Sequence, residues 1–324
     1  MSSVTLAGSV LTGSKAVGLE LFGVMQLAYF DLMTQDSLDF YSSTLAEFGS
    51  FNGAKLPKPV SSSRSASNNN VLEQMQMDTF FYGNFNLMFF VLLGSLGLAL
   101  IVLLIAKISH VRLIKKIAVY LLYEIFLSIV LFTTYDIAFS AGIHWQYADP
   151  SSLQYVYSSL VLYSSFLLLL FVLLLFFCAD PKSFGEFKKM FKRDPASQLY
   201  IPLTIIYKIT LGLYISLTLD DPVTVLMLAF ALAFLMYNLI NLPYRNPLHN
   251  YRACITHISQ FIILIVSNYS KSQSGAPISE KSHSYLPSLM ILVCRAISLI
   301  FSVLLIPYEV YRLIKKMKFY LKKK

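Results

Sequence analysis

Charged residues are scarce in this sequence. Only 13% of the 324 residues are Asp, Glu, Lys or Arg, whereas soluble domains carry about 25%. Hydrophobic residues make up 56% of the chain, and the mean hydropathy is +0.63. A composition so poor in charge and so rich in apolar side chains excludes a disordered chain, a coiled coil and an ordinary soluble enzyme.

Cysteine is also rare, with three residues at positions 178, 254 and 294. All three lie in or beside apolar segments and none is spaced to pair with another, so the sequence predicts neither a disulfide framework nor a metal site. Soluble-enzyme motifs are missing too: there is no phosphate-binding loop, Gly-x-Gly-x-x-Gly, Gly-x-Ser-x-Gly or His-Glu-x-x-His. We therefore expect no enzymatic activity, no catalytic residue and no cofactor.

The apolar residues are gathered into runs long enough to cross a bilayer, which takes about 20 residues of helix. Seven runs qualify, at residues 85–107, 117–138, 153–178, 199–219, 222–242, 253–269 and 286–307. They predict an all-α fold, a polytopic membrane helical bundle over residues 83–308. Residues 1–33 fit either an eighth membrane helix or an amphipathic helix on the membrane surface, because charged residues interrupt their apolar positions.

Lysine and arginine are unequally divided between the two ends of these runs. Eighteen lie on one side and six on the other; the eighteen fall within residues 107–116, 182–193, 245–252 and 312–324. Because Lys and Arg accumulate on the cytoplasmic side of membrane proteins, we expect a cytoplasmic C-terminus with a basic tail at 309–324. Residues 34–82, which include a Ser- and Asn-rich flexible linker, are then an outer segment. Basic blocks placed between apolar runs indicate topology, and we expect no nucleic-acid partner.

Three charged residues fall inside predicted spans, namely Glu124, Lys208 and Arg295. A charge within a span costs about 2.5–3.5 kcal/mol, so such residues usually have a partner or a water path. At about 1.5 Å per residue they lie roughly 10, 12 and 16 Å from the inner surface, in one layer. The layer is either an ion or proton path or gate, or a structural cluster in which Glu124 neutralises the cations. We expect Asp136 to be hydrated near the outer surface, and His257 to contact neighbouring helices.

The inner loop at 182–193 alternates aromatic and basic residues. Its phenylalanines recur at helical spacing with lysines between them, which predicts a short amphipathic helix lying flat on the inner leaflet. Its residues Phe184, Phe187 and Phe191 are expected to face lipid. Anionic lipid headgroups on the cytoplasmic face are the expected partners of the basic ones. The residues of this predicted interfacial loop are Phe184, Phe187, Lys188, Lys189, Phe191, Lys192 and Arg193.

A short motif follows the fifth run. Pro243, Tyr244 and Arg245 form a turn, and Asn250, Tyr251 and Arg252 follow it. This pattern resembles the multispan C-terminal region of large predicted surface proteins of ciliated protozoa, which are in turn distantly similar to transient-receptor-potential-like and polycystin-like membrane proteins. The resemblance covers most of the chain and implies a channel-related bundle. The sequence departs from that pattern, because it has no arginine ladder, no ankyrin repeat and no recognisable selectivity filter.

Three functions are compatible with these observations. A channel-like or channel-derived subunit would form a homo-oligomer, with polar residues lining a path. A surface anchor or structural membrane region would belong to a larger protein whose other part does the work. A seven-span receptor is the third, but the outer loops carry no cysteine pair, and Asp-Arg-Tyr and Asn-Pro-x-x-Tyr patterns are missing. All three place the chain in a membrane, plasma or internal.

Overall fold

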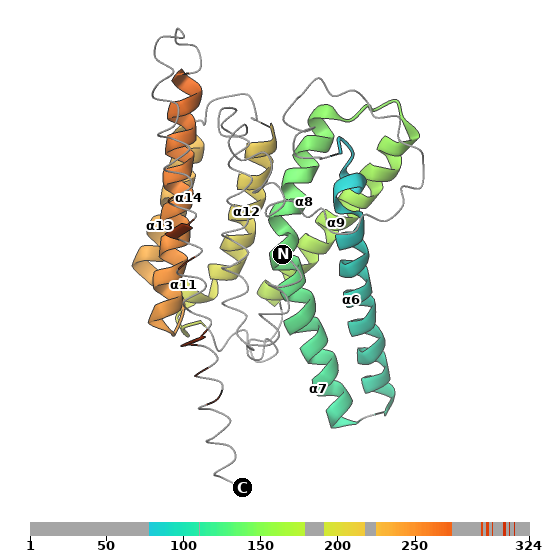
Figure 1. Cartoon of the computed structure of the whole chain (residues 1–324). Helices are drawn as coiled ribbons and strands as arrows, with labels where there is room; N and C mark the ends of the chain where they lie inside the picture. The colour runs from blue at the N-terminus through green and yellow to red at the C-terminus, as the bar shows by residue number, and fades with distance from the viewer. Residues whose placement is uncertain are drawn as a thin grey trace. The chain divides into compact units, whose positions relative to one another are not determined.

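The computed structural model describes residues 78–109, 111–178, 191–217 and 225–273, with single positions between 293 and 314. The described residues fall into two compact units, one before residue 219 and one after it. Each unit is described by itself. Every element in these ranges is a helix, which confirms the all-α prediction (Figure 1). The expected N-terminal helix, most of the outer segment, the last predicted span and the basic tail lie outside the described ranges, apart from those single positions.

The first unit contains the helices from α6 to α12. They are α6 (Phe81–Ser109), α7 (Arg112–Tyr120), the π-helix η2 (Leu121–Phe126), α8 (Leu127–Tyr147), α9 (Leu153–Cys178), α11 (Pro195–Gln198) and α12 (Tyr200–Leu217). The helix α8 packs against α6, α9 and α12, so it forms the centre of this unit (Figure 1). Because α7, η2 and α8 follow without a break, the predicted span 117–138 is part of a longer helix.

Three helices of the described residues are long and apolar enough to cross a membrane. They are Met88–Ser109, Leu153–Phe176 and Tyr200–Leu217, and Val225–Asn241 is a shorter apolar helix. The first two present large apolar side chains to the outside, among them Leu98, Ile101, Leu104, Leu160 and Leu167. In water such a surface would be unfavourable. Long helices with exposed leucine and isoleucine therefore indicate a membrane location.

The short helix α11, which precedes α12, begins with a side-chain cap. The Asp194 carboxylate accepts a hydrogen bond from the backbone N–H of Ser197 at 2.8 Å, and Pro195 occupies the first helical position of α11. Both features are typical of helix starts. Hydrogen bonds from Ser197 to the charged form hold the pKa of Asp194 below its usual value.

The second unit is a helical hairpin. Its helices are α13 (Val225–Asn241) and α14 (Pro247–Gln273), which pack against each other and are joined by the turn at 242–246. Leu242 directly follows α13 and has a φ of 42°, a left-handed conformation that commonly ends helices. Pro247 begins α14, and the Asn246 side chain accepts a hydrogen bond from the backbone N–H of Leu248. The helix α14 therefore extends the predicted span 253–269 at both ends.

Candidate functional site

Polar side chains of α8 lie in the interior of the first unit. Five of them are 5% exposed or less: Thr133, Thr134, Asp136, Ser140 and His144. The apolar surfaces of α6 and α9 face outward instead. This reversal of the pattern of soluble proteins fits a helix bundle in lipid, where polar groups are satisfied inside the protein.

Small residues form the contact between α8 and α12. A methyl group built on Gly212 would lie 2.9 Å from the carbonyl oxygen of Tyr135 and 2.9 Å from the Ala138 side chain, and one on Gly142 would overlap the Ser216 hydroxyl. Residue numbers rise together along the two helices, so α8 and α12 run in the same direction. Such pairs of small residues four apart let membrane helices approach closely. These pairs are not among the features predicted from the sequence, although their spacing is readable there.

Lys208 is the one member of the predicted charge layer whose side chain is among those described. It is 8% exposed, and its ammonium group donates a hydrogen bond to the backbone carbonyl of Leu131 on α8 at 3.1 Å. Glu124 lies in η2, but its side chain is outside the described set, as is Arg295. The charge layer therefore stays a prediction.

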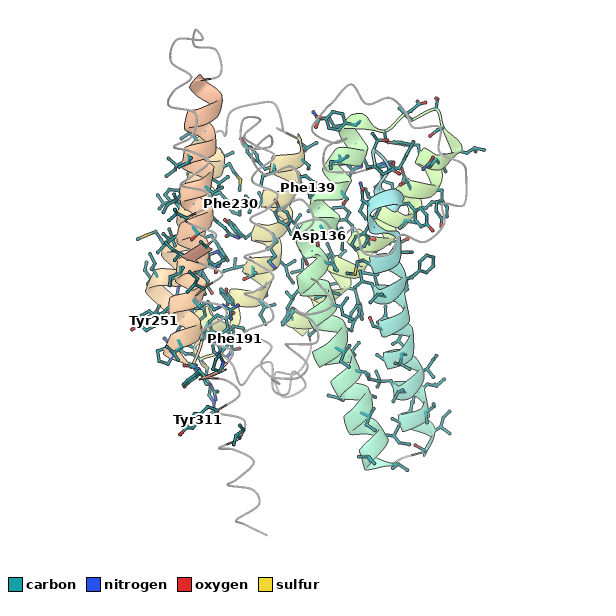
Figure 2. All side chains as sticks on the ribbon, in the orientation of Figure 1. Asp136, Phe139, Phe191, Phe230, Tyr251 and Tyr311 are labelled. Carbon is teal, nitrogen blue, oxygen red and sulfur yellow. The ribbon has the colours of Figure 1, made fainter. Side chains whose placement is uncertain are left out.

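Asp136 occupies a different environment from the one expected. It is 5% exposed on α8 (Figure 2) and follows Tyr135, which is also buried. The expectation that Asp136 is hydrated at the surface is therefore wrong. The apolar run ends at residue 138, but α8 continues to Tyr147 and carries Asp136 into the packed middle of the helix.

The starts of α6 and α9 meet the end of α8 at a buried junction. His144 is fully buried, its Nε2 lies 3.0 Å from the Ser159 hydroxyl, and its ring stacks on Tyr155 at 4.6 Å between centroids. The Ser158 hydroxyl accepts a hydrogen bond from the backbone N–H of Tyr82 at 2.7 Å. Ser158 and Ser159 of α9 thus join this helix to α6 and α8.

Asn250 organises the turn of the second unit. Its side-chain oxygen accepts a hydrogen bond from the backbone N–H of Tyr244 at 2.7 Å, and its amide group donates one to the carbonyl of Tyr244 at 2.8 Å. Tyr244 is buried and its ring packs on His249. The motif on which the family resemblance rests is thus a compact turn, with Pro243 buried, Arg245 exposed and Tyr251 pointing outward (Figure 2).

A row of polar residues follows along the buried face of α14. The row, called the α14 polar row below, consists of Arg252, Thr256, His257, Ser259 and Gln260, each 8% exposed or less. Arg252 heads the row and is 1% exposed. Arg252, which the sequence placed with the basic residues of the inner side, lies within α14, which begins five residues earlier; the side of the membrane stays a prediction. The spacing of 252, 256 and 260 could have revealed the row.

His257 makes the helix contacts that the sequence predicted. Its Nδ1 lies 3.0 Å from Oε1 of Gln260, and its ring meets Phe234 of α13 edge-on at 4.9 Å. Asn238, fully buried on α13, donates a hydrogen bond from its amide to the carbonyl of Phe234. The interface of the hairpin therefore contains polar groups from both helices.

The predicted interfacial helix is wrong at its last phenylalanine. Phe191 is 3% exposed, lies in an isolated bridge and not in a helix, and packs on Tyr200 at 5.6 Å. The α12 helix supplies an aromatic partner that sequence spacing could not show. Lys192 and Arg193 are exposed as expected. The other predicted members, Phe184, Phe187, Lys188 and Lys189, lie outside the described residues.

Metal-binding groups do not gather within the ranges that the structure describes: no three His, Cys, Asp or Glu residues there could hold an ion. Cys254, buried in α14, forms no disulfide with another described residue.

No protein family model matches the chain, and no curated protein or solved structure is detectably similar to it. The resemblance to ciliate surface proteins therefore stays a prediction, and the function must be argued from the arrangement of residues alone.

Proposed function

We propose that the chain is a multi-pass membrane protein that acts as a channel-like subunit, with the α14 polar row lining its ion path. The observation that carries the proposal is the orientation of α14. Arg252, Thr256 and Gln260 are buried, whereas Tyr251, Ile258 and Ile265 are exposed. The helix thus keeps its polar face away from lipid.

Burial of so many polar groups at one helix face requires a reason. A polar group in a dry apolar interior is costly unless it is hydrogen-bonded, and charged residues within membrane bundles commonly mark ion pathways. Arg252 and Gln260 are eight residues apart, about 12 Å along the helix, so the row extends over a substantial part of a bilayer. The row is buried in this structure, so conduction requires a movement that wets it.

The proposal includes the topology expected from the sequence. Seven spans, a cytoplasmic C-terminus and assembly into a homo-oligomer are parts of it; the three membrane-length helices of the described residues support its membrane location. Protease treatment of intact cells should leave a C-terminal tag uncut. Removal of the tag from outside would contradict this topology.

Current recording from purified protein in planar bilayers tests the function. We expect single-channel currents that Thr256→Val combined with Gln260→Leu lowers several-fold, because both changes remove polar groups from the row. Ser164→Ala is the matched control, since Ser164 bonds the Leu160 carbonyl of its own helix, and it should leave the current unchanged. Folded protein that passes no current would overturn the proposal.

The second candidate is a structural membrane region of a larger protein. The close contact of α8 with α12 favours it, because backbone-to-backbone packing at Gly212 leaves no room for water. Thermally stable protein without current, together with unchanged behaviour of the Thr256→Val and Gln260→Leu variant, would select this candidate over the first.

A further inference from the structure

We propose that His144 is a proton-binding site that controls the junction where the starts of α6 and α9 meet the end of α8. Uptake of a proton by His144 separates the end of α8 from α9. The inference concerns the first unit alone, so it does not depend on the proposed ion path of the second unit.

The imidazole of His144 contacts residues from both neighbouring helices of the junction (Figure 1). On α9, the Ser159 hydroxyl lies 3.0 Å from Nε2, and the ring of Tyr155 stacks on the imidazole. Phe80, directly before α6, faces the imidazole at 6.3 Å between ring centroids. A change in the state of this one ring therefore acts on the ends of three helices.

The neutral form of the ring suits this environment, and the charged form does not. His144 is fully buried, and its Nδ1 has no hydrogen-bond partner among the described residues. A neutral imidazole carries one N–H, whereas a protonated imidazole carries two N–H donors and a positive charge. In the protonated ring, Nδ1 is a buried donor without an acceptor, which is costly.

The described groups around the ring are uncharged. Besides Ser159 and Tyr155 of α9, the Ser216 hydroxyl of α12 contacts α8 at Gly142. The other titratable side chains of the junction are Tyr82 of α6 and Tyr157 of α9, whose rings pack on each other at 4.8 Å. Neither these hydroxyl groups nor the phenylalanine supplies the negative charge that an imidazolium needs.

Two carboxylates lie close to the junction in sequence, and both accept other hydrogen bonds. Asp78 accepts one from the backbone N–H of Phe80 at 3.1 Å, and the exposed Asp149 accepts one from the Ser151 hydroxyl at 2.7 Å. Burial lowers the pKa of His144 from 6.5 to about 4, and no neighbouring carboxylate counteracts this decrease.

The direction of the pH response follows from this decrease. His144 lies beyond the predicted span 117–138, and when the helices separate and water reaches the ring, its pKa returns toward 6.5. The open junction then binds a proton more tightly than the closed one. The closed form is therefore fully favoured above pH 6.5 and loses this advantage as the pH falls toward about 4. In the proposed topology the junction lies toward the outer side and responds to acidity there.

Trp145 supplies a local probe of the junction. It directly follows His144 and is the only tryptophan of the chain. Its ring stacks on Phe166 of α9 at 6.1 Å between centroids, and 44% of the residue is exposed. Because separation of α8 from α9 breaks this stacking, the fluorescence of Trp145 reports on the junction without any label.

A pH titration of Trp145 fluorescence on the purified chain in detergent micelles tests the inference. Acidification should shift the emission maximum and raise quenching by acrylamide, reversibly, with a midpoint between pH 6.5 and about 4. His144→Gln keeps a hydrogen-bonding group but cannot take up the proton, so it should abolish the transition. His249→Gln is the matched control, because it removes a buried histidine of the second unit and should leave the transition unchanged.

Ser159→Ala gives a second test that retains the titrating ring. The substitution removes the hydrogen bond that holds the imidazole in the closed junction. The midpoint should therefore move to higher pH by about 0.5–1 unit, the equivalent of one neutral hydrogen bond. Ser164→Ala is its control on the same helix, because Ser164 bonds the Leu160 carbonyl one turn earlier.

Each remaining outcome decides against the inference or for it. Fluorescence of folded wild-type protein that does not change over this pH range overturns it, as does a transition that His144→Gln leaves unchanged. Loss of helix content by circular dichroism over the same range would mean global unfolding and would also overturn it. If His144→Gln does not fold, Ser159→Ala decides: an unchanged midpoint counts against the inference, and a raised midpoint supports it.

Discussion

The two helix pairs at the centres of the two units bury polar groups in different ways. Between α8 and α12, Gly142 and Gly212 let the backbones approach, and the Lys208 ammonium is bonded directly to a backbone carbonyl of the facing helix. Between α13 and α14, the turn is held by Asn250 and the interface contains polar side chains. Helices whose backbones are in close contact leave no room for water between them, whereas helices that meet through side chains can move apart. We therefore expect the first pair to form the more rigid contact, and the proposed ion path lies along the second.

Breaking the first contact should have the largest effect. Gly212→Leu places a side chain where even a methyl group would lie 2.9 Å from the Tyr135 carbonyl oxygen, and backbone atoms cannot move aside cheaply. We expect a loss of about 3 kcal/mol in the free energy of unfolding, measured by denaturing-detergent titration.

Gly97→Leu provides the control for that substitution. No heavy atom lies within 4 Å of a methyl group built at Gly97 on α6. Because leucine favours a helix over glycine, this variant should gain up to about 0.8 kcal/mol. Equal losses in the free energy of unfolding from Gly212→Leu and Gly97→Leu would show that the α8–α12 contact does not cause the loss.

The turn of the second unit should be the next most sensitive feature. Asn250→Ala removes both hydrogen bonds to the Tyr244 backbone and leaves a buried N–H and carbonyl without that partner. We expect the free energy of unfolding to fall by about 2–3 kcal/mol. Tyr251→Phe, at the exposed neighbouring position, should change it little. A stable Asn250→Ala variant would mean that helix packing alone holds the hairpin.

Each unit buries a cation, Lys208 in the first and Arg252 in the second. Lys208→Met loses the bond to the Leu131 carbonyl but also removes the cost of burying an ammonium group. These effects oppose each other, so the free energy of unfolding should change by no more than about 1 kcal/mol. The reversal potential of any current should stay where it is in the wild type. A change of selectivity in Lys208→Met would place the path in the first unit instead.

Helix positions could be read from the sequence because apolar runs mark them directly. The helix α9 has the predicted bounds, 153–178, since its run is interrupted by neither charge nor proline. The apolar runs do not include the polar ends of the helices. The burial of Asp136 and Arg252 was therefore not predicted. The start of α14 was nevertheless readable, because Asn246 followed by Pro247 is a typical helix N-terminus.

The contacts between helices could not be read in the same way. Sequence order does not say which helices are neighbours, so the pairing of Gly212 with α8 required the fold. The same limit applies to Lys208, whose carbonyl partner on α8 is 77 residues away in the chain. Depth matching selected Glu124 and Arg295 as its companions, but depth alone cannot place helices side by side.

The smallest predicted effect concerns the residue that ends α13. Leu242 has a φ of 42°, a conformation that costs a side-chain-bearing residue about 1–2 kcal/mol. Leu242→Gly removes this cost but adds about 0.5–1 kcal/mol of chain entropy in the unfolded state. The free energy of unfolding should therefore rise by about 0.5 kcal/mol. Leu239→Gly, an exposed leucine inside the same helix, should instead lower it by about 1 kcal/mol. If both glycine variants were destabilised equally, the left-handed residue would have no special role, and the hairpin turn would depend on Asn250 alone.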